Sequence, residues 1–300
     1  MHLGKMGREN RRHGLTIIAA ATMMLACGNP KVSDKAVEEF YQPVSQAEDV
    51  RRNIPDVLME LPRMEVPASE TMIEHEGFRI SYNRTRLIPN WVAYELTKSE
   101  TYGNVERTDY FDVDPSISGR QAQFSDYSHT GYDRGHMAPA GDMKWSQDAM
   151  DACFYLTNIC PQNHNLNQGA WNDLEIKCRQ WARRYGKAWI VTGPVVTSEE
   201  PKTIGRRHVV VPDAFFKVVL VPKGEGYEAA AFVMKNDNGN LDYTQCSMTV
   251  DEAENLTGID FYYALPDDIE DKVERSYNAS GWKESCGMDM DLTERFEIGQ

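Results

Sequence analysis

Three patterns that often reveal the architecture of a chain are missing from this 300-residue sequence. No two cysteines are spaced as C-x-x-C, which argues against a structural zinc site. No segment repeats along the chain, which argues against an architecture of stacked repeats. The apolar run LTIIAAATMMLA near the N-terminus has 12 residues, too few to cross a bilayer comfortably. With 41% hydrophobic and 10% aromatic residues, the chain can nevertheless bury a sizeable core.

Residues 1–26 have the organisation of a signal peptide. Basic residues come first, the apolar run follows, and the small residue Ala26 stands before Cys27. This arrangement resembles a bacterial lipoprotein signal, in which the cysteine carries a lipid and becomes the new N-terminus, although Met24 stands where such signals usually have leucine. The alternative is a plain secretory signal followed by an incidental cysteine. We expect an exported protein, lipid-anchored through Cys27 at a bacterial membrane, periplasmic or at the cell surface.

Positive charge is scarce in the rest of the chain. Without residues 1–26, the chain has 28 basic and 45 acidic side chains and a net charge of −17. This balance argues against non-specific nucleic-acid binding through overall charge, so any phosphate-binding function requires a local basic cluster. One candidate cluster falls within eleven residues of a predicted helix, although a solvated helix face is the alternative. Its members are Lys177, Arg179, Arg183, Arg184 and Lys187.

The cysteines do not define a disulfide framework. An exported protein can keep disulfides, but five cysteines remain besides Cys27, so at least one of them is free. Their pairing cannot be read from the sequence. They are Cys153, Cys160, Cys178, Cys246 and Cys286.

We predict a polar tether over residues 27–70, with a short helix near Glu48–Arg52, followed by one domain over residues 71–300. Short β-branched and aromatic runs bounded by glycine, proline and asparagine predict strands. Apolar spacing predicts a helix from Gln168 to Tyr185, and a second helix is expected at Ser146–Asp151. The chain after Glu274 is expected to be loosely structured. The fold class is therefore α+β, with a mostly antiparallel sheet and flanking helices. The predicted strands are FRISYN, WVAYELT, AWIVTGPVV, HVVVP, AFFKVVLV and YEAAAFVM.

Two stretches combine residue types suited to chemistry. In YDRGHMAPAGD (residues 132–142), we interpret Gly135 as the point where the backbone turns between Arg134 and His136. In TNICPQNHNLNQGAWNDLE (residues 157–175), Asn167 falls on the apolar side of the predicted helix. A buried amide there needs a hydrogen-bond partner, because an unsatisfied one costs about 1–3 kcal/mol. The alternative is that Asn167 caps the helix, while Glu175 and Arg179 form a solvated pair.

Together the two stretches are similar to the motifs of the DNA/RNA non-specific endonucleases, the ββα-metal nucleases, and the similarity extends from about Tyr82 to Pro266. The resemblance implies that His136 is the general base and that Asn167 is the one protein ligand of a divalent metal, Mg²⁺ with Mn²⁺ as a substitute. Glu175 would hold the water shell of the metal. Further residues implied at the site are Arg134, Arg179 and, with a different loop spacing, Arg107 as phosphate contacts, and Asn158 and Gln162 as supporting residues.

These residue types suit phosphodiester hydrolysis. An imidazole can accept a proton from water at neutral pH, and Mg²⁺ prefers oxygen ligands while keeping several waters. The resemblance implies DNA and RNA as substrates, and a metal-bound water that protonates the leaving 3′ oxygen predicts 5′-phosphate products. The alternatives are a catalytically silent nucleic-acid-binding lipoprotein and a phosphodiesterase for small phosphate esters. Outside the motif histidine, we expect His129 and His164 to be loop residues and His75 and His208 to be surface or strand residues. Asp133 and Asp142 are expected to support the loop by accepting backbone hydrogen bonds rather than by binding metal.

Overall fold

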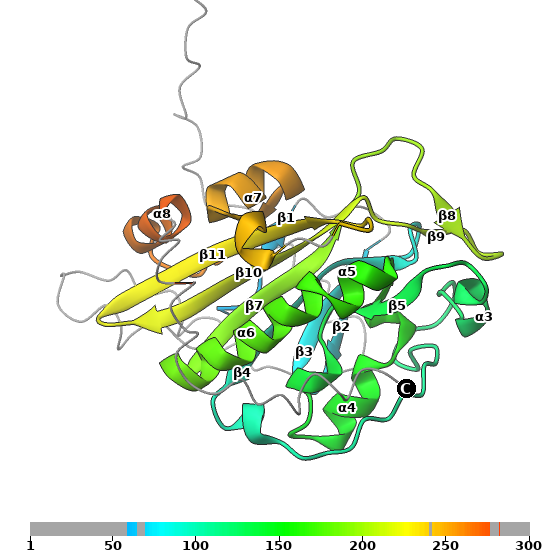
Figure 1. Ribbon diagram of the computed structural model, residues 1–300, viewed down its shortest axis with the longest axis horizontal. Helices are drawn as coiled ribbons and strands as arrows, with labels where there is room; N and C mark the ends of the chain where they lie inside the picture. The colour runs from blue at the N-terminus through cyan, green and yellow to red at the C-terminus, as the bar shows by residue number, and fades with distance from the viewer. Residues whose placement is uncertain (1–58, 65–69, 240–241, 277–281, 283–300) are drawn as a thin grey trace, which may run out of the picture. The chain divides into compact units, whose positions relative to one another are not determined.

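A computed structural model of the chain describes residues 59–64, 70–239, 242–276 and 282. The predicted signal peptide, the Cys27 anchor, the short helix near residues 48–52 and nearly all of the chain after residue 276 lie outside these residues. Within them, the fold is α+β, with a seven-stranded sheet and helices on both of its faces (Figure 1). The predicted fold class is confirmed.

Every pairing in the seven-stranded sheet is antiparallel. The strand order is β12-β11-β10-β7-β4-β3-β2. Five predicted strands recur here with end shifts of a few residues, whereas the sixth, HVVVP, shrinks to Val209–Val210 in a separate two-stranded ribbon. The strands are β2 (Glu70–His75), β3 (Phe78–Asn83), β4 (Ile88–Thr97), β7 (Lys187–Val195), β10 (Ala214–Lys223), β11 (Gly226–Lys235) and β12 (Ser247–Met248).

Strand β10 shows how the sheet separates two apolar cores. Successive side chains of a strand point to opposite faces. Phe215 and Val219 belong to one core, and Phe216 and Val218 belong to the other. Because both faces are covered, the strand is a nearly continuous apolar run rather than an alternation of apolar and polar residues.

Helices cover the two faces differently. Helix α6 (Ala170–Tyr185) packs its apolar side onto the first core and ends at Gly186, where φ is +93°. Glycine adopts this conformation without strain, which explains the helix end. Helices α7 (Val250–Thr257) and α8 (Asp267–Arg275) contribute to the second core. Among the helices that the structure describes, none is both long and apolar enough to cross a membrane.

The long predicted helix, Gln168–Tyr185, is present as α6 and begins two residues later than predicted. Gly169, with φ −107° and ψ −117°, separates α5 (His164–Gln168) from α6, so Asn167 does not continue the face of α6. The second predicted helix is present as α4 (Gln147–Cys153), and the Ser146 side chain caps it by accepting from the Ala149 N–H. The remaining short helices are α3 (Phe124–Tyr127), η3 (Glu100–Tyr102), η4 (Ala140–Asp142), η5 (Leu156–Asn158) and η6 (Tyr243–Cys246).

Three two-stranded ribbons complete the described fold. They are β1 (Arg63–Met64) with β13 (Ile259–Asp260), β5 (Asp133–His136) with β6 (Ile159–Gln162), and β8 (Thr203–Ile204) with β9 (Val209–Val210). The first ribbon shows that the predicted tether ends before residue 70. Met59 is fully buried in the second core, and residues 63–64 pair with β13, so residues 59–64 belong to the fold.

The structure also bears on the expectations for the cysteines and for the chain after Glu274. Cys153, Cys160, Cys178 and Cys246 are all free and buried, while Cys286 lies outside the described residues. Trp282, in the segment expected to be loose, packs edge-on against Trp181 of α6 with ring centroids 4.6 Å apart. No disulfide joins the four described cysteines, and Trp282 belongs to the packed core.

Candidate active site

Strand β5 brings the first motif to one side of the fold. Arg134 and His136 are two residues apart, so they share a face of the strand, and both line a pocket of about 420 Å³. Gly135 lies opposite Cys160 in the pairing with β6, and a Cβ on Gly135 would lie 2.1 Å from Gln162 Oε1. The interpretation of Gly135 as a turn is therefore wrong. Glycine is required because Gln162 occupies the space where a side chain would stand.

His136 is held in its neutral form. Its ring contacts Phe111 and Phe154, with centroid distances of 5.4 and 4.8 Å. Burial, followed by the charges of Arg107 and Arg134, keeps the pKa of His136 well below its usual value of 6.5. Its Nε2 atom is buried, and no described residue hydrogen-bonds to it. One ring nitrogen of a neutral imidazole carries no hydrogen, so Nε2 can accept a proton in the tautomer that has its hydrogen on Nδ1.

Asn167 has the hydrogen-bond partner that the sequence argument required. Its Nδ2 donates to Asp133 Oδ2 over 2.9 Å, and His164 Nδ1 lies 3.0 Å from the same oxygen. Asp133 was expected to accept backbone hydrogen bonds, but its described partners are these two side chains. His164 was expected in a loop, yet it begins helix α5 and lines the pocket. Asp133 thus orients the Asn167 amide so that its oxygen is directed away from the carboxylate.

Glu175 lines the pocket from α6 and is only 9% exposed. Burial raises the pKa of its carboxyl to about 7, while the charges of Lys217, Arg179 and Arg107 oppose that rise. Lys217 lies on β10, fully buried against the Trp171 ring, with its Nζ 4.8 Å from the ring centroid. Among the described residues, no hydrogen-bond partner reaches Lys217 Nζ. A buried cation therefore lies behind the pocket, on the α6 side of the sheet.

Arg179 is fixed by a buried network. Its NH1 donates to Asp142 Oδ1 over 2.7 Å, and the Tyr94 hydroxyl donates to Asp142 Oδ2 over 2.8 Å. Asp142 is fully buried, so its expected role as an acceptor of backbone hydrogen bonds is replaced by these side-chain partners. A Cβ on Gly141 would lie 2.8 Å from Arg179 NH1, which explains glycine at that position. Both residues of the predicted solvated pair, Glu175 and Arg179, are buried at the pocket.

The positive charge at the pocket comes mainly from outside helix α6. Arg107 lies over the Phe154 ring at 4.9 Å and donates to Asp109 over 2.5 Å. Within α6, Arg183 donates to the Thr101 side chain and carbonyl. At the start of β7, Lys187 pairs with Glu95 over 3.0 Å. The members of the predicted basic cluster therefore do not act as one surface, because they bind different parts of the fold. The cations that line the pocket are Arg107, Arg134, Lys144 and Arg179.

Two of the predicted supporting residues, Asn158 and Gln162, lie behind the pocket. Asn158 is fully buried: its Oδ1 accepts from the Ala138 N–H, and its Nδ2 donates to the carbonyls of Ala138 and Cys153. These bonds fix the chain that follows His136. Gln162 is fully buried beside Gly135, and neither amide atom has a hydrogen-bond partner among the described residues.

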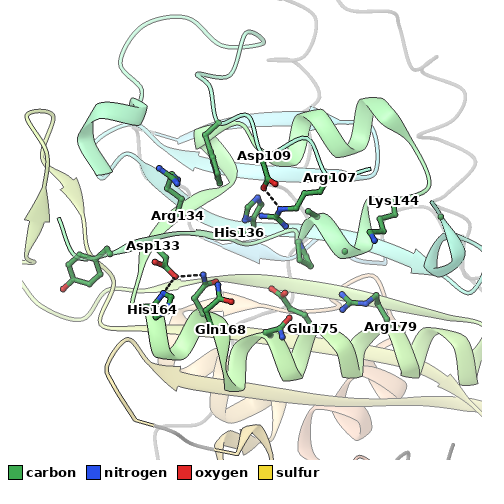
Figure 2. Close-up of a pocket in the computed structure, with 18 of the residues that line it drawn as sticks. Arg107, Asp109, Asp133, Arg134, His136, Lys144, His164, Gln168, Glu175 and Arg179 are labelled. Atoms are coloured by element: carbon green, nitrogen blue, oxygen red, sulfur yellow. Dashed lines mark hydrogen bonds and ion pairs between the residues drawn. The ribbon is translucent and has the colours of Figure 1, made fainter. Parts of the chain in front are cut away.

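Figure 2 shows the result, with β5 and the 107–109 segment facing helices α5 and α6 across the pocket. The predicted base, metal ligand, carboxylate and three arginines all line this one pocket. Phe111 and Lys217 were not selected from the sequence. Phe111 carried no recognisable signal, whereas Lys217 was detectable as the one charged residue inside the apolar run AFFKVVLV.

Comparisons with known proteins agree with this site. A family described as DNA/RNA non-specific endonuclease matches residues 59–268. Nuclease EXOG from Danio rerio is 36% identical over 202 residues, which cover 62% of this chain and 59% of that protein. Nuclease C1 from Cunninghamella echinulata is 34% identical over 209 residues, covering 64% and 83%. The crystal structure of the EndoG/EndoGI complex matches with a TM-score of 0.62 and 29% identity, covering 66% of this chain and 88% of that chain.

The matched region spans less than two thirds of the EXOG proteins. It covers 54–62% of their lengths in fish, frog, mouse and human. The family match over residues 59–268 includes the pocket described here, while a large part of the EXOG relatives has no counterpart in the alignments.

Proposed function

Because the chain belongs to the DNA/RNA non-specific endonuclease family, we propose that it hydrolyses phosphodiester bonds of DNA and RNA with little sequence preference. One observation carries the proposal. The Nε2 atom of a neutral, buried His136 lines the same pocket as Asn167 and Glu175, and no described residue hydrogen-bonds to it. A general base, an amide oxygen and a carboxylate at one pocket are the groups that metal-assisted hydrolysis requires.

The pocket residues fit a divalent cation. The hydrogen bond to Asp133 engages the amide nitrogen of Asn167 and leaves its oxygen for a ligand. Mg²⁺ and Mn²⁺ both accept oxygen ligands, so Asn167 would hold the ion and Glu175 would hold its water shell. When bound, such an ion neutralises charge on the phosphate and on the leaving oxygen.

Side chains of the protein carry out the proton transfer and bind the phosphate. His136 Nε2 accepts a proton from the attacking water, which is possible near neutral pH because the imidazole is uncharged there and, with its one hydrogen on Nδ1, leaves Nε2 as an acceptor. Arg134 and Arg107 contact the phosphate oxygens, a role for which the guanidinium fork is suited. Arg179, held by Asp142, adds a fixed positive charge beside them. Cleavage on the 3′ oxygen side leaves products with a 5′-phosphate.

The first experiment tests the activity and its metal requirement. Purified protein is incubated with a supercoiled plasmid and with RNA, in Mg²⁺, in Mn²⁺ and in EDTA, and the ends of the products are analysed. We expect both polymers to be cut with either ion, to 5′-phosphate ends, and to survive in EDTA. Binding without cleavage would favour the catalytically silent alternative. Hydrolysis of bis(p-nitrophenyl) phosphate without cleavage of the polymers would favour the small-ester alternative.

We also propose that residues 1–26 direct export and that Cys27 carries a lipid. The support is the sequence pattern alone, because residues 1–58 lie outside the described structure. Cells expressing the chain are labelled with a radioactive fatty acid and fractionated. Label and membrane association should both be lost in Cys27→Ser. Membrane association that persists in this variant would contradict a lipid anchor at Cys27.

A further inference from the structure

Arg134 lies between two aromatic rings. Its guanidinium carbon is 4.5 Å from the Phe111 ring centroid and 4.6 Å from the Phe124 ring centroid. Phe111 continues inward, with its ring 5.0 Å from that of Phe154 and 5.4 Å from that of His136. The inner ring therefore belongs to the packing of the site, and its environment explains its presence.

The outer ring has no such explanation. Phe124 is 49% exposed, so it leaves a large part of an aromatic side chain in water next to the pocket. Its helix α3 is firmly anchored by a capping box, in which the backbone N–H of Gln123 donates to the carboxylate of Asp126. Asp126 is buried and also accepts from the backbone N–H of Arg207. The exposed ring thus stands on a fixed support rather than on a loose loop.

We propose that Phe124 is a stacking platform for a nucleobase of the strand whose phosphate Arg134 contacts. The proposal rests on the proposed function and adds a base-binding contact to it. The Arg134 guanidinium covers one side of the ring, and the exposed part of the ring is available to a flat aromatic partner. In nucleic acid, the flat group next to a phosphate is a base. Every base has a π-face, so such a contact is compatible with cleavage that ignores sequence.

This contact favours one form of the substrate. A base can stack on Phe124 only after it leaves its neighbours in a duplex, and unstacking costs free energy. Single strands and RNA loops present such bases without that cost. We therefore expect tighter binding to single-stranded substrate than to duplex DNA of the same sequence.

Binding is measured in the His136→Ala background, so that the substrate stays intact. The probes are a fluorescent single-stranded DNA and a strand of the same length made of abasic nucleotides, each titrated in Mg²⁺. Phe124→Leu should weaken binding of the base-bearing strand about tenfold, as expected for one lost base stack, and should change binding of the abasic strand less than twofold. Phe124→Trp should restore tight binding.

The matched control is Tyr263→Leu. Tyr263 is also exposed and lies 5.3 Å from the Arg63 guanidinium, but Arg63 does not line the pocket, whereas Arg134 beside Phe124 does. We expect this variant to bind both strands like the parent. An equal loss on both strands in Phe124→Leu would overturn the proposal and show that the ring only positions Arg134, and unchanged binding would overturn it as well.

The outcome separates this proposal from the proposed function. Cleavage by the chain with native Phe124 is measured in parallel with the binding titrations. If that protein cuts polymers but Phe124→Leu binds as the parent does, only the stacking contact is wrong. If that protein cuts neither polymer in Mg²⁺, the proposed function fails, whatever the variant binds.

Discussion

The two faces of the central sheet bury carboxyl groups in opposite electrostatic surroundings. On the α6 face, burial raises the pKa of Glu175 to about 7; the cations Lys217 and Arg179 oppose the rise, and one carboxylate, Asp142, adds to it. On the α7–α8 face, burial and then the neighbouring carboxylates Glu254 and Glu270 raise the pKa of Glu274 to about 9. Burial acts in the same direction on both faces, so the charges of the neighbours make the difference.

This difference shows why overall charge is a poor guide to the chemistry of this chain. The formal net charge of −14 describes the whole sequence. The fold nevertheless brings four cations from separate positions in the sequence to one pocket. The α6 face places a carboxyl group with a pKa of about 7 and a neutral histidine at one pocket. The α7–α8 face gathers carboxyl groups that destabilise one another when ionised, and we assign it no role in hydrolysis.

Removing the base on the α6 face should give the largest effect. His136→Ala should lower kcat on plasmid by about 10²–10⁴-fold, which is the usual contribution of general-base catalysis, while the thermal midpoint of unfolding stays near that of the parent. His129→Asn is the control, because His129 is exposed and has a positive φ of 58° that asparagine tolerates. A His136→Ala variant that kept more than about a tenth of the activity would contradict the assignment.

A smaller effect should follow when the orientation of Asn167 is released. Asp133→Ala removes the acceptor of the Asn167 amide. The Mg²⁺ concentration at half-maximal activity should rise about 10–100-fold, as for other residues that orient metal ligands, and high Mg²⁺ should restore much of kcat. His164→Ala keeps the bond between Asp133 and Asn167, so its Mg²⁺ requirement should stay near that of the parent. Equal requirements in Asp133→Ala and the parent would refute this positioning role.

Lys217→Met makes the α6 face resemble the other face by removing its buried cation. Lys217 is the strongest influence that lowers the pKa of Glu175, so that pKa should rise above about 7 and leave more of the carboxyl protonated at neutral pH. A pKa change of one unit alters the ionised fraction up to tenfold, so kcat at pH 7 should fall by a factor on the order of ten and recover at pH 9.

The pH–rate profile identifies the titrating group. The pKa of His136 lies well below 6.5, so loss of activity just below pH 7 is expected from Glu175 rather than from the histidine. Lys217→Met should move the acidic limb to higher pH, and Lys223→Met, near the end of the same strand, should leave it in place. An unmoved limb in Lys217→Met would show that the buried cation does not set the charge of Glu175.

Much of the fold could be predicted because its strands have strong local signals. Runs such as AFFKVVLV are apolar on both faces and long enough to be recognised without a partner. Strands β5 and β6 were missed because DRGH and ICPQ have no such pattern, and they form only by pairing with each other. The break at Gly169 was also missed, since glycine within a helical pattern is often tolerated.

The candidate site was predicted in its residues but not in its interactions. The two motifs identified His136, Asn167 and Glu175, and the structure places all three at one pocket. The partners of Asp133 and Asp142 could not be predicted, because their hydrogen bonds join side chains from 31 to 48 residues apart. For the same reason, local charge density suggested one basic helix face, whereas its members bind separate elements.

The smallest expected effect lies on the α7–α8 face and concerns stability alone. The pKa of Glu274 in the folded protein, about 9, lies above its ordinary value of 4.5, so the folded protein holds this proton more tightly than the unfolded chain does. The stabilisation is complete below about pH 4.5 and is lost as the pH rises toward 9. Glu274→Gln mimics the protonated form at every pH.

At pH 8, Glu274→Gln should therefore raise the thermal midpoint by about 2–4 °C, the shift that about 1 kcal/mol produces in a domain of this size. At pH 4.5 the variant and the parent should unfold at the same temperature, and kcat should be unchanged at both pH values. Glu225→Gln, at an exposed turn, controls for the loss of one negative charge. A midpoint at pH 8 that rises equally in both variants would mean that overall charge, rather than the buried carboxyl cluster, limits stability on this face. A fall in kcat would show that the α7–α8 face influences catalysis at the pocket on the α6 face.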